Sequence, residues 1–142
     1  MTANHTKNHK NETACKLTDE ICLPDTNLPR VVIIGGGFAG LALVEKLKHK
    51  EVQVVLFDKN NFHQFQPLLY QVATSALEPD SIVFPFRKQI NGYKNVLFRL
   101  AEVEEIQPSS NSLITSKGNV NYDYLILATG TNTNFFGMDS VE

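Results

Sequence analysis

The chain has 142 residues, of which 42% are hydrophobic and 20% charged, and its formal net charge is −2. This length fits one domain with a sizeable core, and the composition excludes a wholly disordered chain. Lysines and arginines are scattered rather than gathered into a basic patch, so the sequence predicts no nucleic-acid partner.

Residues 1–29 form a polar leader that we expect to be flexible, because it shows no sustained apolar period. It lacks the apolar region of a secretory signal, and no apolar run in the chain approaches the ~18 residues of a membrane span. The sequence therefore favours a cytoplasmic location. Cys15 and Cys22 have a spacing that fits neither a redox pair nor a zinc ribbon, so we expect reduced thiols and no metal site.

The organised part is expected to begin at residue 30. Residues 31–34 are a β-branched run, which is typical of a strand buried on both faces of a parallel sheet. Residues 38–50 carry apolar side chains at helical intervals, and residues 52–57 form a second apolar run. Strand, helix and strand in this order predict a βαβ unit of an α/β fold.

A glycine-rich motif, Gly35-Gly36-Gly37-Phe38-Ala39-Gly40, connects the first strand to the helix and matches the dinucleotide-binding fingerprint. In this motif Gly35 makes the tight turn, Gly37 lets a pyrophosphate approach the backbone, and Gly40 lets the helix pack close to the strand. The free N–H groups at the start of the helix are expected to face the phosphates.

Asp58 follows the second strand, where an acidic side chain can accept hydrogen bonds from ribose hydroxyls. It disfavours a 2′-phosphate, although Lys59 beside it leaves NADP open on charge alone. NAD and FAD share the fingerprint, so the motif does not decide between them. The downstream region favours FAD, because an irregular Pro- and Phe-rich stretch stands where a nicotinamide domain has another regular βα repeat.

The stretch after Asp58 is expected to begin as a polar loop over residues 59–66. A helix is predicted for residues 67–76, since proline suits its first turn, and a short helix for residues 86–90. Residues 95–106 are predicted to form one or two strands. Their expected inward positions are Val96, Phe98, Val103 and Ile106.

Two turn signals, at residues 108–111 and 117–119, predict a small antiparallel meander. The meander leads into residues 124–128, "YLILA", which we expect to be another buried strand. This strand ends on Thr129 and Gly130.

Two segments, "NNFHQFQPLLYQVATSAL" and "ATGTNTNFFGM", resemble the type II NADH:quinone oxidoreductases, the alternative NADH dehydrogenases. The resemblance covers residues 30–142. It implies a Rossmann-like FAD-binding domain of the two-dinucleotide-domain flavoprotein type, incomplete in this chain, with the small meander. It also implies an oxidoreductase in which hydride passes from NADH to the flavin and electrons leave to a quinone of the respiratory chain.

Carried over to this sequence, the resemblance implies that the glycine motif holds the FAD pyrophosphate and that Asp58 holds the adenosine ribose. The segment from His63 to Leu69 would pass near the ribityl chain and the flavin ring, and Val103 would lie near the adenine. No catalytic residue is assigned. The implied cofactor-binding residues are Gly35, Gly37, Phe38, Ala39, Gly40, Asp58, Lys59, His63, Gln66, Val103, Ala128, Thr129 and Gly130.

Other interpretations of these residues stay open. His63 is either a flavin contact or a solvated or turn-stabilising histidine. Phe62, Phe65 and Tyr70, with the leucines between them, are more typical of core or interface positions than of a cofactor site.

The chain contains one dinucleotide fingerprint, whereas the family it resembles carries a second one in an NADH domain. We therefore expect an N-terminal fragment that is inactive alone and binds FAD weakly or not at all. NADH and quinone would be partners of the full-length enzyme, with peripheral membrane association through a missing C-terminal region and a homodimer left open.

Two alternatives remain. One is another flavoprotein reductase of the pyridine nucleotide-disulfide type, although no cysteine follows residue 22. The other is a stand-alone nucleotide-binding module without catalysis.

Overall fold

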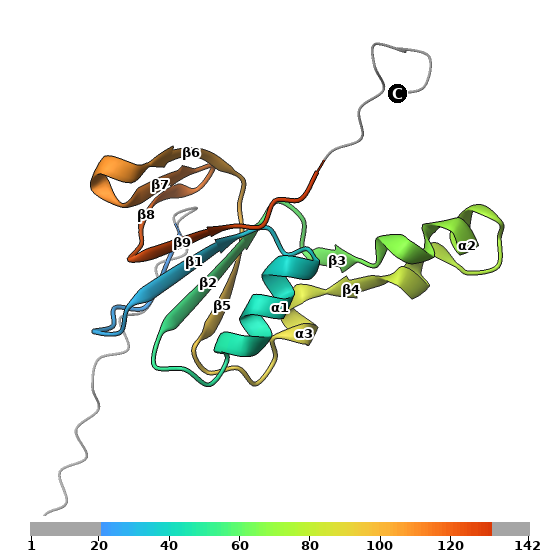
Figure 1. Ribbon diagram of the computed structural model, residues 1–142, viewed down its shortest axis with the longest axis horizontal. Coiled ribbons are helices and arrows are strands. Elements are labelled where there is room, and N and C mark those ends of the chain that lie inside the picture. Colours follow the sequence, from blue (N-terminus) through green and yellow to red (C-terminus); the bar gives the residue numbers. More distant parts are fainter. Residues whose placement is uncertain (1–20, 132–142) are drawn as a thin grey trace, which may run out of the picture.

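A four-stranded parallel sheet forms the centre of the computed structural model, which describes residues 21–131 (Figure 1). Its strand order is β5 (Val96–Leu100), β2 (Gln53–Asp58), β1 (Arg30–Ile34) and β9 (Tyr124–Leu127). The predicted α/β class and the strands at 31–34, 52–57 and 124–128 are thus confirmed to within one or two residues.

The two faces of the sheet carry separate parts of the core. One face packs against α1 (Phe38–Leu47) and α3 (Phe86–Gln89), and the other against the antiparallel meander. Because successive residues of a strand point to opposite faces, the unbroken apolar run of β1 supplies both layers. Val31 and Ile33 lie in the first layer, and Val32 and Ile34 lie in the second.

Strand β9 is less buried than its sequence predicts. Tyr124 and Leu127 are each 61% exposed, so the expectation of a fully buried strand is wrong for these two residues. The reason is the position of the strand, since among the described residues β9 pairs with β1 alone and forms the edge of the sheet. Apolar composition gives no information on whether a strand is central or at an edge.

An arm projects from the body between β2 and α3 (Figure 1). It contains an antiparallel ribbon whose two strands are separated by short helices. Its elements are β3 (Phe62–Gln64), η1 (Gln66–Leu68), α2 (Leu69–Ala73), η2 (Pro79–Ile82) and β4 (Val83–Pro85).

The arm corrects two predictions. The expected polar loop contains strand β3, and the expected helix over residues 67–76 begins as a 3-10 turn and ends at Ala73. Thr74 donates its hydroxyl to the carbonyl of Tyr70 at 3.0 Å, and Ser75 takes a left-handed φ of 58°. The left-handed Ser75 ends the helix because it departs from helical backbone geometry, whereas the Thr74 hydroxyl bonds a carbonyl of the last turn.

The predicted meander is confirmed. It consists of β6 (Val103–Gln107), β7 (Ser112–Thr115) and β8 (Gly118–Asn121), joined in part by η3 (Pro108–Ser110). The two turn signals found in the sequence coincide with η3 and with the tight β7–β8 turn. Gly118 has a φ of 122°, a backbone conformation that favours glycine.

Part of the polar leader packs onto this body. The Ile21 N–H donates to the Lys117 carbonyl at 3.1 Å, and the Arg99 guanidinium donates to the Cys22 carbonyl. Burial, and to a smaller extent Arg87, lowers the pKa of Arg99. The packed chain therefore starts before the expected boundary at residue 30. Cys22 is disulfide-bonded, so the expectation of a reduced thiol is wrong for this residue.

The Asn95 side chain closes the C-terminal end of α1. Its Nδ2 amide donates to the carbonyls of Leu47, Lys50 and Val52 at 3.0, 3.1 and 3.0 Å.

We expect Asn95→Asp to lower the free energy of unfolding by about 2 kcal/mol, because a carboxylate would face three carbonyl oxygens without a proton to donate. Urea unfolding checks this, with the exposed Asn91→Asp as control. An equal loss in both variants would contradict the capping role.

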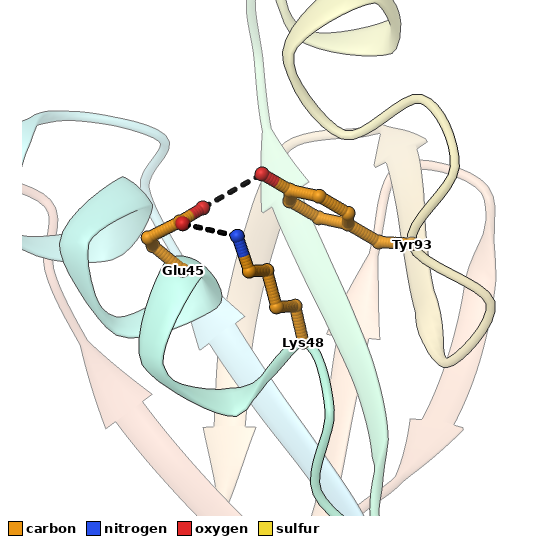
Figure 2. A network of polar contacts seen from close by, with 3 residues as sticks. All are labelled: Glu45, Lys48 and Tyr93. Carbon is orange, nitrogen blue, oxygen red and sulfur yellow. Dashed lines mark hydrogen bonds and ion pairs between the residues drawn. The ribbon is translucent and has the colours of Figure 1, made fainter.

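A surface network joins α1 to the loop before β5 (Figure 2). The Tyr93 hydroxyl donates to Glu45 Oε2 at 2.7 Å, while Lys48 Nζ pairs with Glu45 Oε1 and lies 4.9 Å from the centre of the Tyr93 ring. These hydrogen bonds, first that of Lys48 and then that of Tyr93, lower the pKa of the Glu45 carboxyl.

This lowered pKa fixes the sign of a pH dependence. The contribution of Glu45 to stability is present above its ordinary pKa of 4.5 and is lost as the pH falls through the lower value of the folded state. We therefore expect Glu45→Gln to lower the melting temperature slightly at pH 7, and by less as the pH falls below 4.5. The effect is small because Glu45 is exposed. A loss of melting temperature that is the same at pH 3 as at pH 7 would contradict this expectation. The exposed Glu51→Gln serves as control.

Candidate functional site

A cavity of about 810 Å³ lies at the carboxyl ends of strands β1, β2 and β9. Ligands of open α/β sheets bind at this edge, and the volume falls in the range of small-molecule sites. Every predicted cofactor-binding residue lines the cavity except Gly40. The lining residues among those predicted are Gly35, Gly37, Phe38, Ala39, Asp58, Lys59, His63, Gln66, Val103, Ala128, Thr129 and Gly130.

Further lining residues were not assigned from the sequence. Ile34, Phe57 and Leu127 lie at the carboxyl ends of their strands, so the strand-end rule is a signal that could have identified them. The others lie on the arm or beside predicted residues, and their place depends on how distant segments pack. They are Gly36, Asn60, Phe62, Gln64, Ala101, Glu102 and Thr131.

The three fingerprint glycines meet different surroundings. Gly35 has a φ of 100°, and a Cβ there would lie inside 3.0 Å of the Ala128 carbonyl. A Cβ on Gly40 would lie inside 3.0 Å of the Gly35 carbonyl oxygen. A Cβ on Gly37 would meet nothing within 4 Å. The first two glycines are thus required by the fold, whereas Gly37 borders open space in the cavity.

The Asp58 carboxylate holds the glycine turn. Oδ2 accepts the Gly36 N–H at 2.7 Å, and Oδ1 accepts the Asn60 N–H at 2.8 Å. A carboxylate has about four lone-pair sites, so two remain for a ligand. Asp58 therefore has a role that the sequence did not reveal, namely fixing the turn from the neighbouring strand.

His63 is buried, being 8% exposed, so the interpretation of it as a solvated histidine is wrong. Its Nδ1 lies 3.1 Å from the Gly36 carbonyl oxygen, which supports the turn-stabilising interpretation. Phe38 packs edge-on against the His63 ring, with 5.0 Å between ring centres, and against Phe65 at 5.3 Å.

The aromatic and leucine side chains of the arm are largely outside the core. Tyr70 is 83% exposed, and Leu69, Phe65 and Phe62 are 42%, 37% and 36% exposed. The core interpretation is therefore wrong for these four residues, and α2 itself has no buried residue. Their apolar character leaves the interface interpretation in place.

Residues 21–131 contain neither a membrane-spanning helix nor a cluster of metal ligands. No helix in this range is long and apolar enough to cross a membrane. No group of three or more His, Cys, Asp or Glu side chains there is arranged to hold a metal ion. The segment "NFFG" lies outside the described residues.

The sequence profile of the pyridine nucleotide-disulphide oxidoreductases matches residues 29–142. Type II NADH:quinone oxidoreductase NdhA of Mycobacterium tuberculosis is 41% identical over 114 residues, which cover 78% of this chain and 24% of that protein. The external alternative NAD(P)H-ubiquinone oxidoreductase B2 of Arabidopsis thaliana is 33% identical over 130 residues, which cover 82% of this chain and 22% of that protein. The resemblance to the type II enzymes is thus confirmed, and the chain spans about a quarter of the length of these relatives.

Solved structures agree with this fold. The sulfide:quinone oxidoreductase of Aquifex aeolicus superposes with a TM-score of 0.70 at 28% identity, covering 75% of this chain and 25% of that one. NDH2 of Plasmodium falciparum superposes with a TM-score of 0.71 at 22% identity, and the match covers 80% of this chain and 24% of that one. At this identity the likeness is evidence for the fold and not for the function. By its fold and by the profile that covers residues 29–142, the chain belongs to the pyridine nucleotide-disulphide oxidoreductase family.

Proposed function

We propose that this chain is the FAD-binding part of a type II NADH:quinone oxidoreductase. The observation that carries the proposal is the open space beside Gly37, at the start of α1 and inside the cavity. A phosphate can approach bare backbone at this point and meet the free N–H groups of the first helical turn. The 41% identity to NdhA supports the same assignment.

The lining residues would divide the cofactor between them. The N–H groups of Gly37, Phe38 and Ala39 would hold the pyrophosphate, and Asp58 would accept hydrogen bonds from the adenosine ribose through its unused lone pairs. When bound, FAD supplies the redox chemistry, accepting hydride from NADH and delivering electrons to a quinone. No side chain of this chain is assigned a catalytic role.

The remaining residues would line the length of the cofactor. Lys59 would lie beside the ribose, Val103 near the adenine, and Gln66 with the arm near the flavin ring. Ala128, Thr129 and Gly130 would border it from the end of β9, as their place in the cavity allows.

The same proposal includes contact with a membrane. Because quinones are lipid-soluble, we propose that the full-length enzyme works at a bilayer surface, the cytoplasmic face of the cell membrane. Dimer formation also belongs to the proposal and is tested by the mass of the particle in solution.

Titration with FAD tests the cofactor assignment. We expect ADP to displace FAD, because both carry the pyrophosphate. Riboflavin has no pyrophosphate, so we expect it to show no binding above the buffer control. Equilibrium dialysis measures weak affinities, and we expect the 142-residue chain to bind FAD weakly or not at all. Bound FAD that ADP does not displace, or NAD⁺ binding without FAD, would contradict the assignment. The second outcome would favour a stand-alone nucleotide-binding module.

A further inference from the structure

Gly36 is not one of the three fingerprint glycines, yet its backbone is held from three directions. Its N–H donates to Asp58 Oδ2 at 2.7 Å, and its carbonyl lies 3.1 Å from Nδ1 of the buried His63. A Cβ on Gly36 would lie inside 3.0 Å of the Phe86 ring, which is fully buried. Three separate elements therefore fix one residue of the glycine turn.

Two of these three contacts come from the base of the arm. His63 belongs to β3, and Phe86 follows β4 directly. The two strands are paired, with His63 opposite Phe84, so the ribbon brings both side chains to the glycine turn. The Phe86 N–H also donates to the Asn61 carbonyl at 3.1 Å, which closes the base of the arm.

The chemistry of the contact decides that Nδ1 of the histidine ring carries a proton. A carbonyl oxygen can only accept a hydrogen bond, so Nδ1 of His63 must carry the proton and donate. In the neutral ring this leaves Nε2 as an acceptor. The edge-on contact of Phe38 with the ring holds His63 in this orientation.

The peptide plane carries the effect of this hydrogen bond to the cavity. The Gly36–Gly37 peptide is trans, so its carbonyl and its N–H point in opposite directions. By holding the Gly36 carbonyl, His63 sets the direction of the Gly37 N–H. Gly37 is the residue that borders open space in the cavity.

We propose that His63 is a positioning residue, which aims the Gly37 N–H at the phosphate site by donating from Nδ1 to the Gly36 carbonyl. The part of this inference that concerns phosphate rests on the proposed FAD-binding function. The hydrogen bond and the turn geometry do not depend on it. His63 thus acts through the backbone rather than by direct contact of Nε2 with the cofactor.

Two substitutions separate these roles. The side-chain amide of asparagine can place its N–H where Nδ1 lies, whereas that of glutamine reaches the position of Nε2. His63→Asn should therefore retain the donor to Gly36, and His63→Gln should lose it. The measurements are hydrogen exchange of the Gly36 amide and FAD or ADP affinity by equilibrium dialysis, with ¹⁵N shifts of the His63 ring in the unsubstituted chain.

We expect the ring of the unsubstituted chain to carry its proton on Nδ1. The Gly36 N–H keeps its own partner, Asp58 Oδ2, but a glycine turn released at the Gly36 carbonyl should open more readily. We therefore expect the Gly36 amide to exchange about tenfold faster in His63→Gln, and within about threefold of the unsubstituted rate in His63→Asn. Ligand affinity should follow the same order. A proton on Nε2, or an affinity kept by His63→Gln and lost by His63→Asn, would overturn the inference.

The inference and the proposed function can fail separately. If the unsubstituted chain binds NAD⁺ but neither FAD nor ADP, the proposed function fails, while the ring shifts and the exchange rates still decide the role of His63. Should either variant unfold, the proton position in the unsubstituted ring remains decisive.

Discussion

Replacing Gly40 by alanine is expected to lower the free energy of unfolding by about 3 kcal/mol, the upper part of the usual range for overpacking. The new Cβ would lie inside 3.0 Å of the Gly35 carbonyl oxygen and 3.5 Å from Ile33 Cγ2. A backbone carbonyl cannot rotate away as a long side chain can. Helix α1 would have to move away from β1, and the packing of Val44 would loosen with it.

Urea unfolding measures this effect, with the midpoint falling and the slope unchanged. Gly37→Ala is the matched control, because it makes the same chemical change in the same motif. If both variants unfold at the same urea concentration, close packing at Gly40 is not what the fold requires.

Replacing Gly37 by alanine is expected to weaken FAD and ADP binding at least ~100-fold, which corresponds to about 2.7 kcal/mol. The added Cβ meets no protein atom within 4 Å, so it projects into the space that a phosphate would occupy. The backbone there has a φ of −72°, which alanine adopts without strain. The free energy of unfolding should therefore change by less than about 1 kcal/mol, since the substitution is at a helix N-cap.

Equilibrium dialysis and urea unfolding of the same preparation check both halves of this prediction. Unchanged binding in Gly37→Ala would show that the phosphates do not pass this residue. Lost binding with an equally large loss of stability would show that Gly37, like Gly40, serves the fold. The pair of variants thus separates a glycine reserved for a ligand from a glycine required by packing.

Local sequence was sufficient to predict the βαβ unit, the meander and the glycine turn with Asp58, whereas the other predicted lining residues were implied by the resemblance to the type II enzymes. The strands were identifiable because β-branched runs fit a sheet buried on both faces, and the meander because its turns carry their own residue signals. Gly35, Gly40 and Asp58 were identifiable because a tight turn, close helix packing and a strand end each demand particular residue types at a set spacing. These requirements act over a few residues, so they are present in the sequence itself.

The arm and the contacts it makes were decided by the tertiary structure. Pairing of β3 with β4 joins segments about twenty residues apart, and neither Phe62–Gln64 nor Val83–Pro85 shows a sustained period of its own. The burial of His63 follows from that pairing, as does its hydrogen bond to Gly36. The exposure of Tyr124 and Leu127 depends on the order of strands in the sheet rather than on their own composition.

The sequence by itself thus determined where a dinucleotide would meet the backbone, because the glycine requirements are local. The tertiary structure alone decided how that backbone is held. A hydrogen bond to the Gly36 carbonyl needs a donor at one point in space, and any segment of the chain could supply it. Only the pairing of the two arm strands places the His63 ring at that point.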